Sequence, residues 1–160
     1  MALVKPLVMY NGRVSQLLAA DTLDAVVAEV DSLTLTNANA GSAVIGTPVY
    51  ISAASSFNLA RADASGTADP IGLVSSSSIA AAGSGSVLTD GFLTATTGQW
   101  DAVTGGTGGL TAGSSYFLSA TTAGRLTTTA PTATGQFVSF IGKAVSTTVL
   151  EVSIDRAIAL

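Results

Sequence analysis

The sequence predicts an all-β protein, a small β-barrel or sandwich with an extended N-terminal arm. The main observation is that short runs of β-branched and aromatic residues alternate with Gly, Ser, Thr and Ala turns from residue 32 onward. A second is that the first thirty-one residues differ in composition from the rest. We therefore expect an arm over residues 1–31 and a β domain over residues 32–160. A domain of 160 residues buries about 70% of the surface that its unfolded chain would expose, so a hydrophobic core is possible.

The arm begins with a predicted β-hairpin. Residues 7–10 and 13–17 are β-type runs that flank Asn11-Gly12, the preferred pair for a two-residue type I′ turn. In the acidic segment that follows, apolar residues recur at the spacing of one helical face, but β-branched valines disfavour a helix. Both a helix and an extended chain stay open there, and the extended form is preferred; the apolar residues are Leu23, Val26, Val27 and Val30.

The β domain is predicted to hold a series of short strands. A hairpin is expected to join residues 116–118 to 125–127, and a last one residues 137–145 to 148–154. The Asp90-Gly91 pair indicates either a tight hairpin or a bulge in one long strand. The low-complexity residues 75–86 read as turns in preference to a flexible linker. Further strands are expected at residues 33–35, 49–51, 71–74, 87–89 and 92–94.

One short helix is expected within this series. Thr96 or Thr97 can cap a single turn that holds Trp100 and Val103, because a threonine hydroxyl accepts from the free N–H groups of a first turn. The glycines at 105, 106, 108 and 109 should end it.

Charge is scarce along the chain. Six basic and ten acidic residues make up 10% of it, against about 25% in soluble domains, and the mean hydropathy is +0.55. A membrane protein would need about 18 consecutive apolar residues, and no such run exists. The first residues, MALVKP, also lack the pattern of a signal peptide, so none is expected. Burial of the surface in an assembly is the better explanation, since interface cores are depleted in charge.

Composition excludes several kinds of chemistry. The chain has no histidine and no cysteine, which rules out Ser-His and Cys-His nucleophiles, histidine or thiolate metal sites, and disulfides. The basic residues are scattered singly and the net charge is −4, which argues against nucleic-acid binding. We expect no enzyme activity, no catalytic residue, no cofactor and no metal.

Four weaker patterns each have a structural alternative that we favour. Asp90 and Asp101 are candidates for a glycosidase pair, but a turn and a helix end explain them better. Asp63 and Asp69 vaguely resemble a calcium loop without enough acids. The glycines of residues 105–109 lack the Lys-Ser/Thr of a phosphate loop. A sugar-binding platform is a less favoured reading than core packing for the aromatic residues Trp100, Tyr116, Phe117, Phe137 and Phe140.

Three motifs in the last third resemble a pattern that recurs in virion structural proteins of tailed phages. They are GLTAGSSYFLS at 109–119, GRLTTTAP at 124–131 and GQFVSFIGKAVSTTVLEVSI at 135–154. Residues 46–52, residues 60–74 and the N-terminal LVMYNGRVSQL also look similar. Ala20 departs from the pattern, because relatives tend to have Gly before Asp-Thr-Leu. Similar motifs occur in capsid decoration (cement) proteins and in tail-fibre modules.

The resemblance implies a non-enzymatic decoration protein, made in the host cytoplasm and bound to the outer capsid surface of the virion. Such proteins look like homotrimers that clamp neighbouring subunits of the major capsid protein. A length of 160 residues favours this reading over a fibre. The alternative is a tail-fibre or baseplate adsorption module that binds host glycans. Expected capsid-contact residues, which otherwise belong to a core strand, are Leu3, Val4, Leu7 and Val8.

Overall fold

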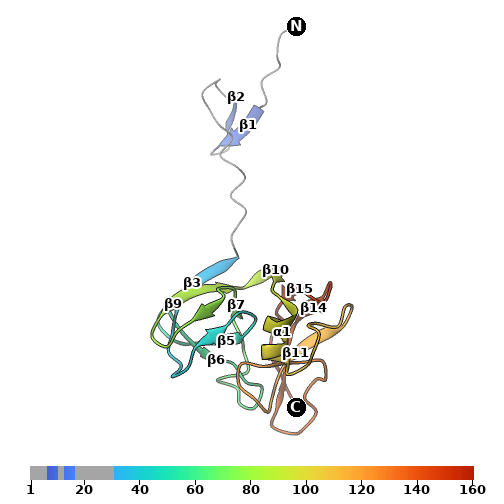
Figure 1. Cartoon of the computed structure of the whole chain (residues 1–160). Helices are drawn as coiled ribbons and strands as arrows, with labels where there is room; N and C mark the ends of the chain where they lie inside the picture. Colours follow the sequence, from blue (N-terminus) through green and yellow to red (C-terminus); the bar gives the residue numbers. More distant parts are fainter. Residues whose placement is uncertain (1–6, 11–12, 17–30) are drawn as a thin grey trace. The chain divides into compact units, whose positions relative to one another are not determined.

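The computed structural model describes residues 7–10, 13–16 and 31–160 (Figure 1). The chain divides into two units, Met1–Val30 and Asp31–Leu160, of which the second is predominantly β-sheet. In the first unit, β1 (Leu7–Tyr10) pairs antiparallel with β2 (Arg13–Gln16), so that Tyr10 lies opposite Arg13. This register confirms the predicted hairpin. Its two turn residues and residues 17–30, for which helix and extended chain were both open, lie outside the described residues.

Five strands of the second unit close into a barrel, which confirms the predicted fold class. They are arranged in the order β3-β6-β5-β7-β9, and all neighbours are antiparallel except β3 and β6, which are parallel. A two-stranded sheet of β4 and β8 accompanies the barrel. The bounds are β3 (Ser32–Asn37), β4 (Ala43–Val44), β5 (Pro48–Ala53), β6 (Ser56–Leu59), β7 (Gly72–Val74), β8 (Ser78–Ile79) and β9 (Ser84–Leu88).

The barrel is filled by apolar side chains around Phe57, which is fully buried. They come from alternate positions of the strands, as expected when one strand face looks inward. Asn37 is buried among them and is fully satisfied: its Nδ2 donates to the carbonyls of Ile79 and Gly41, both at 2.9 Å, and its Oδ1 accepts from the Asn39 N–H at 2.9 Å. The cluster consists of Leu35, Ala43, Val49, Phe57, Val74, Ile79 and Val87.

A second, open sheet has the order β10-β15-β14-β11-β12. The predicted hairpins between β11 and β12 and between β14 and β15 are both present. The expected strand over residues 137–145 is instead two strands, because β13 leaves this sheet and pairs with β16. The bounds are β10 (Asp90–Thr94), β11 (Ser115–Leu118), β12 (Leu126–Thr127), β13 (Phe137–Val138), β14 (Phe140–Ala144), β15 (Val149–Ser153) and β16 (Ile158–Ala159).

Thr89 is where the chain passes from the barrel to the open sheet. β9 ends at Leu88 and β10 begins at Asp90, which pairs with Ser153 in an unbroken register. Both predictions for Asp90-Gly91 are therefore wrong, since the pair forms neither a tight hairpin nor a bulge. Residues 75–86 contain β8 and connect two neighbouring barrel strands, so the linker alternative is also wrong.

The single helix of the described residues, α1 (Thr97–Thr104), forms where it was predicted. Thr96 is the N-cap: its hydroxyl accepts from the Gln99 N–H, and the Gln99 side chain accepts from the Thr96 N–H, a capping box. Gly105 ends the helix at φ 73°, a left-handed conformation that costs glycine little. Trp100 and Val103 are the buried residues of the helix, as expected.

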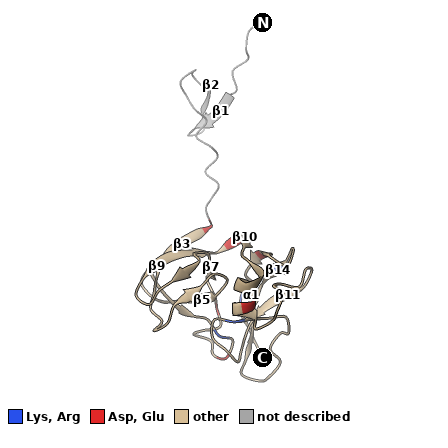
Figure 2. Cartoon of the chain, in the orientation of Figure 1, with Lys and Arg blue, Asp and Glu red and all other residues tan. Residues whose placement is uncertain are grey.

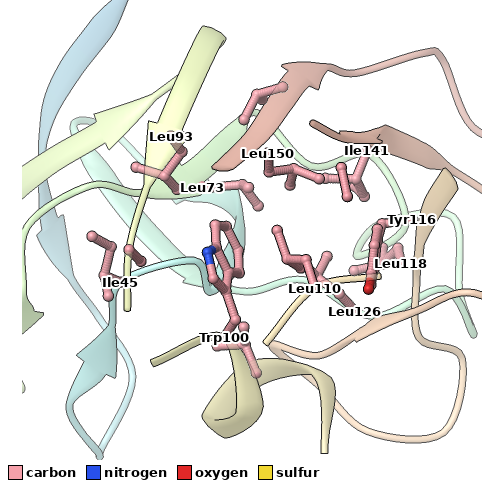
Figure 3. Packing of buried hydrophobic residues seen from close by; sticks show 14 of the residues in the cluster. Ile45, Leu73, Leu93, Trp100, Leu110, Tyr116, Leu118, Leu126, Ile141 and Leu150 are labelled. Carbon is pink, nitrogen blue, oxygen red and sulfur yellow. The ribbon is translucent and has the colours of Figure 1, made fainter. Parts of the chain in front are cut away.

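The helix fills the space between the barrel and the inner face of the open sheet (Figure 3). Trp100 is fully buried there, and its indole Nε1 donates to the Thr148 carbonyl at 3.0 Å. A Cβ on Gly46 would lie 2.8 Å from the Trp100 ring, so only glycine fits against it. Around Trp100 lie Ile45 and Leu73 from the barrel side and Leu93, Leu110, Tyr116, Leu118, Leu126, Ile141 and Leu150 from the sheet side.

Candidate interaction surface

The two carboxylates that might have served a glycosidase occupy unrelated settings. Asp90 is exposed at the start of the edge strand β10. Asp101 lies on α1 and accepts from the backbone N–H groups of Gly108, at 3.1 Å, and Gly109, at 2.8 Å. Asp101 therefore holds the glycine-rich loop after the helix in place, which is a structural role.

The loop with Asp63 and Asp69 is closed by its own contacts. Asp63 pairs with Arg61, and the Thr67 hydroxyl donates to the Asp63 carboxylate at 3.3 Å. The hydrogen bond from Arg61 lowers the pKa of Asp63 and raises that of Arg61. In the part of the chain that the structure describes, no three acidic residues gather into a potential metal site.

The five aromatic residues considered for a sugar platform do not form one. Trp100 and Tyr116 are in the core, where the Tyr116 hydroxyl accepts from the Thr111 N–H at 2.9 Å, and the half-buried Phe137 packs against the same core. Phe117 and Phe140 are half-buried on neighbouring strands, with ring centroids 5.8 Å apart at an interplanar angle of 73°. This edge-to-face pair belongs to the side of the open sheet that faces away from Trp100.

We call that side the outer sheet face. Cross-strand partners share a face, so the strand registers identify its rows. One row runs Phe92, Glu151, Lys143 and Ser115 across β10, β15, β14 and β11. Phe92 is 67% exposed and Val145, just beyond β14, is 56% exposed. The outer sheet face consists of Phe92, Thr94, Ser115, Phe117, Phe140, Lys143, Val145, Val149 and Glu151.

A bulge in β14 helps to separate the two sides of the sheet. Tyr116 pairs with Gly142 but Phe117 pairs with Phe140, so Ile141 is an extra residue in its strand. Ile141 is fully buried, whereas Phe140 is partly exposed. Gly142 allows β14 and β15 to lie close together, because a Cβ there would come within 2.0 Å of the Glu151 carbonyl oxygen.

Hydroxyl groups line a shallow groove around the other edge strand, β12. Three adjacent depressions share Thr127, and the one that is also lined by Thr104 and Thr111 has a volume of about 230 Å³. Arg125 lies beside it and approaches the C-terminal end of α1 near Gly105, where a cation is favourable. The groove is lined mainly by Thr104, Thr107, Thr111, Thr121, Thr127 and Thr129.

The barrel presents a different surface. None of its five strands contains a charged residue, and β5, β7 and β9 are uniformly tan in Figure 2. Its exposed strand positions are Thr34, Ser52, Ala53 and Ser84, together with the apolar Leu33 and Ile51. In the described residues no helix is long and apolar enough to span a membrane.

Sequence reasoning placed most of the strands but did not find the outer sheet face. Of the expected capsid-contact residues, Leu7 and Val8 lie in β1, and Leu3 and Val4 lie outside the described residues. Comparison of the chain with models of protein families, with curated proteins and with solved structures finds no significant match.

Proposed function

We propose that this chain is a non-enzymatic structural protein of a phage virion. In this proposal it is a capsid decoration (cement) protein that binds the outer surface of the expanded head, as a homotrimer between subunits of the major capsid protein. The observation that carries the proposal is a charge-poor surface with an apolar outer sheet face. Such a surface is stable in water at high concentration when partners cover it.

In this proposal the protein stabilises the shell because its binding is coupled to the expansion of the capsid lattice. A protein that binds the expanded lattice more tightly than the unexpanded one stabilises the expanded form by its differential affinity. Several weak contacts per trimer act together, because the first contact raises the effective concentration of the others. In this proposal the N-terminal arm supplies one such contact, through Leu3, Val4, Leu7 and Val8.

A second candidate is a tail-fibre or baseplate module that adsorbs to host glycans. The hydroxyl-lined groove around Thr127 is the observation that favours it, because rows of hydroxyls can exchange hydrogen bonds with sugars. The groove has no exposed aromatic platform: its aromatic lining residue, Tyr116, is buried. For this reason the decoration role is the better supported of the two.

Co-sedimentation tests the choice between them. The full chain is mixed with heads of the encoding phage that have been stripped of accessory proteins, in expanded and unexpanded forms. The decoration role predicts saturable binding to expanded heads and weaker binding to unexpanded ones. Binding to host cells or purified surface glycans, with none to heads, would instead establish the adsorption role.

A matched pair of variants sharpens this test. Replacing Leu7 and Val8 together with Ser should weaken binding to expanded heads if the arm is a capsid contact. The control replaces Thr34 and Thr36 with Ser on the barrel strand β3, where Thr34 is exposed and Thr36 half-buried, and should bind like the wild type. Equal binding by all three proteins would remove the arm from the proposal.

A further inference from the structure

We propose that the outer sheet face is the surface through which copies of this chain meet, with Lys143 of one copy facing Glu151 of the next. The inference rests on the proposed homo-oligomer and adds to it a location and a pairing. Three features of the structure support it: the apolar residues of the face, its two charges, and the different surface of the barrel.

The outer sheet face exposes several apolar side chains. Phe92 stands on the edge strand β10 with 67% of its surface exposed, and Val145 is 56% exposed on the same side of the sheet. Val149 lies beside Val145, and the half-buried Phe117–Phe140 pair lies on the same face at the other end of β14. Aromatic residues are enriched in the cores of interfaces and dominate their binding energy, so Phe92 is the natural anchor.

The outer sheet face also carries one positive and one negative side chain. Lys143 and Glu151 are direct cross-strand partners and both are exposed. Nevertheless, the ion pair that forms among the described residues is Arg61–Asp63, and Lys143 and Glu151 are not within ion-pair distance of each other. Among the described residues each charge therefore has no ion-pair partner, and it can pair with a charge of another copy.

Neighbouring copies of the chain can satisfy both charges. One cation next to one anion is a pattern that other copies of the same face complement. In a homotrimer, Lys143 of each copy faces Glu151 of one neighbour, and Glu151 of that copy faces Lys143 of the other neighbour. Asp90 is exposed at the start of β10 on the same side of the sheet.

The barrel exterior fits this role less well. Its strands expose the aliphatic Leu33 and Ile51, at 42% and 46%, but they expose no aromatic side chain. Its strands carry no charge that would orient a neighbouring copy. The barrel is also closed, so it offers no free strand edge, whereas within residues 31–160 β10 pairs with β15 on one side and with no strand on the other.

Charge reversal tests the pairing. Lys143→Glu and Glu151→Lys are each made in the full chain, and the oligomeric state is followed by sedimentation velocity and native mass spectrometry over a concentration series. We expect each variant to raise the dissociation constant at least tenfold, because like charges then face each other. The double variant should restore the wild-type assembly.

Mixing the two single variants separates a contact between copies from one within a chain. Copies with Lys143→Glu carry two negative charges on the face, and copies with Glu151→Lys carry two positive charges. The mixture should therefore associate although neither variant does so alone. If Lys143 and Glu151 instead paired within one chain, the double variant would restore assembly but the mixture would not. This outcome would overturn the inference.

Phe92→Ser tests the anchor, with an expected rise of about thirtyfold in the dissociation constant, the fold-change that corresponds to loss of a hot spot. Ile51→Ser is the matched control, since Ile51 is 46% exposed on the barrel strand β5. Asp69→Lys, in an exposed loop, controls for the charge change of Glu151→Lys. Neither control should alter assembly. Circular dichroism and the fluorescence of Trp100 establish that every variant is folded.

The outcomes for this inference and for the proposed function are distinct. A protein that binds expanded heads but is monomeric, or whose oligomer ignores all three face substitutions, retains the proposed function and loses the inference. An oligomer that responds as expected but does not bind heads does the reverse. If the face variants remain oligomeric but fail to bind heads, the outer sheet face belongs to the capsid contact and the inference is wrong.

Discussion

The barrel and the open sheet bury their apolar side chains in different ways. In the barrel every strand has a neighbour on both sides and all inward positions meet one another around Phe57. The open sheet buries only its inner face, against α1 and the barrel, and it ends in two edge strands, β10 and β12. Among the described residues, the barrel has no free strand edge, whereas the sheet has one face and two edges that no other strand or helix covers.

The distribution of side-chain chemistry follows the same division. The barrel strands carry no charge and expose small residues with the aliphatic Leu33 and Ile51, while the outer sheet face combines exposed phenylalanine and valine with Lys143 and Glu151. Exposed apolar side chains that gather on one face mark an interaction site. We therefore expect the interaction surface to lie on the open sheet.

The largest expected effects come from emptying either core. Phe57→Ala in the barrel and Trp100→Ala at the junction should each lower the free energy of unfolding by about 3–5 kcal/mol, since a fully buried ring is lost and a cavity remains. Urea denaturation followed by circular dichroism measures both. In Phe57→Ala, the fluorescence of Trp100 reports on the junction while the barrel is weakened.

The two transitions of Phe57→Ala decide whether barrel and sheet are separate. Residues Asp31–Leu160 form one unit, so the circular dichroism and fluorescence transitions should coincide. A barrel that unfolds at lower urea than the surroundings of Trp100 would show that the comparison describes two independent modules.

The next effect concerns the close approach of the barrel to the helix. Gly46→Ala should cost about 2–4 kcal/mol, because Gly46 has φ 84° and the new methyl would lie 2.8 Å from the Trp100 ring. Gly66→Ala is the control: nothing lies within 4 Å of a Cβ there, and the change should be neutral or slightly stabilising. Thermal unfolding of both variants measures the difference, and equal melting temperatures would mean that Trp100 can move away.

A smaller effect is expected from Asp101→Ala on the sheet side. The variant frees the N–H groups of Gly108 and Gly109 and should lower stability by about 1 kcal/mol. Asp90→Ala removes an exposed carboxylate and should change stability by less than about 0.5 kcal/mol. If instead both substitutions abolished a sugar-cleaving activity of the wild type, the carboxylates would have to be interpreted as a catalytic pair.

The smallest effect concerns Arg61 and Asp63 in the exposed loop. The pKa of Asp63 is lowered by Arg61, so the pair stabilises the fold above the unfolded-state pKa of about 3.9 and this contribution is lost as the pH falls through the lower folded-state value. Asp63→Asn should therefore be slightly less stable than the wild type at pH 7, and the difference should be smaller at pH 2. In 1 M salt the difference at pH 7 should shrink, because exposed charges are screened. Melting curves at both pH values and both salt concentrations measure it.

Local patterns predicted the elements that depend on neighbours in the sequence. The hairpin around residues 11–12, the capping box of Thr96 and the end of the helix at Gly105 could all be anticipated, because each is formed by groups a few residues apart. Patterns of this kind did not reveal the two-residue strands β4, β8 and β16. These strands exist only because a distant segment supplies the hydrogen bonds.

The passage of the chain from the barrel to the open sheet at Thr89 shows most clearly what local sequence patterns cannot predict. A turn-forming Asp-Gly pair between two β runs predicts a local reversal, yet β9 finds its partners in β3 and β7, and β10 finds its partner in β15, some sixty residues later. Which of two pairings wins depends on the total apolar surface that each buries, and this sum includes residues from the whole domain.

By itself, the sequence determined the strand-rich character of this protein, the place of its helix and the absence of histidine and cysteine chemistry, since these depend on residue types and short spacings. Only the tertiary structure decided that five strands close into a barrel, that Asp101 holds a glycine loop, and that Phe92, Lys143 and Glu151 share one exposed face. Side chains that come from three strands become neighbours through the registers of those strands, and registers are set by long-range packing.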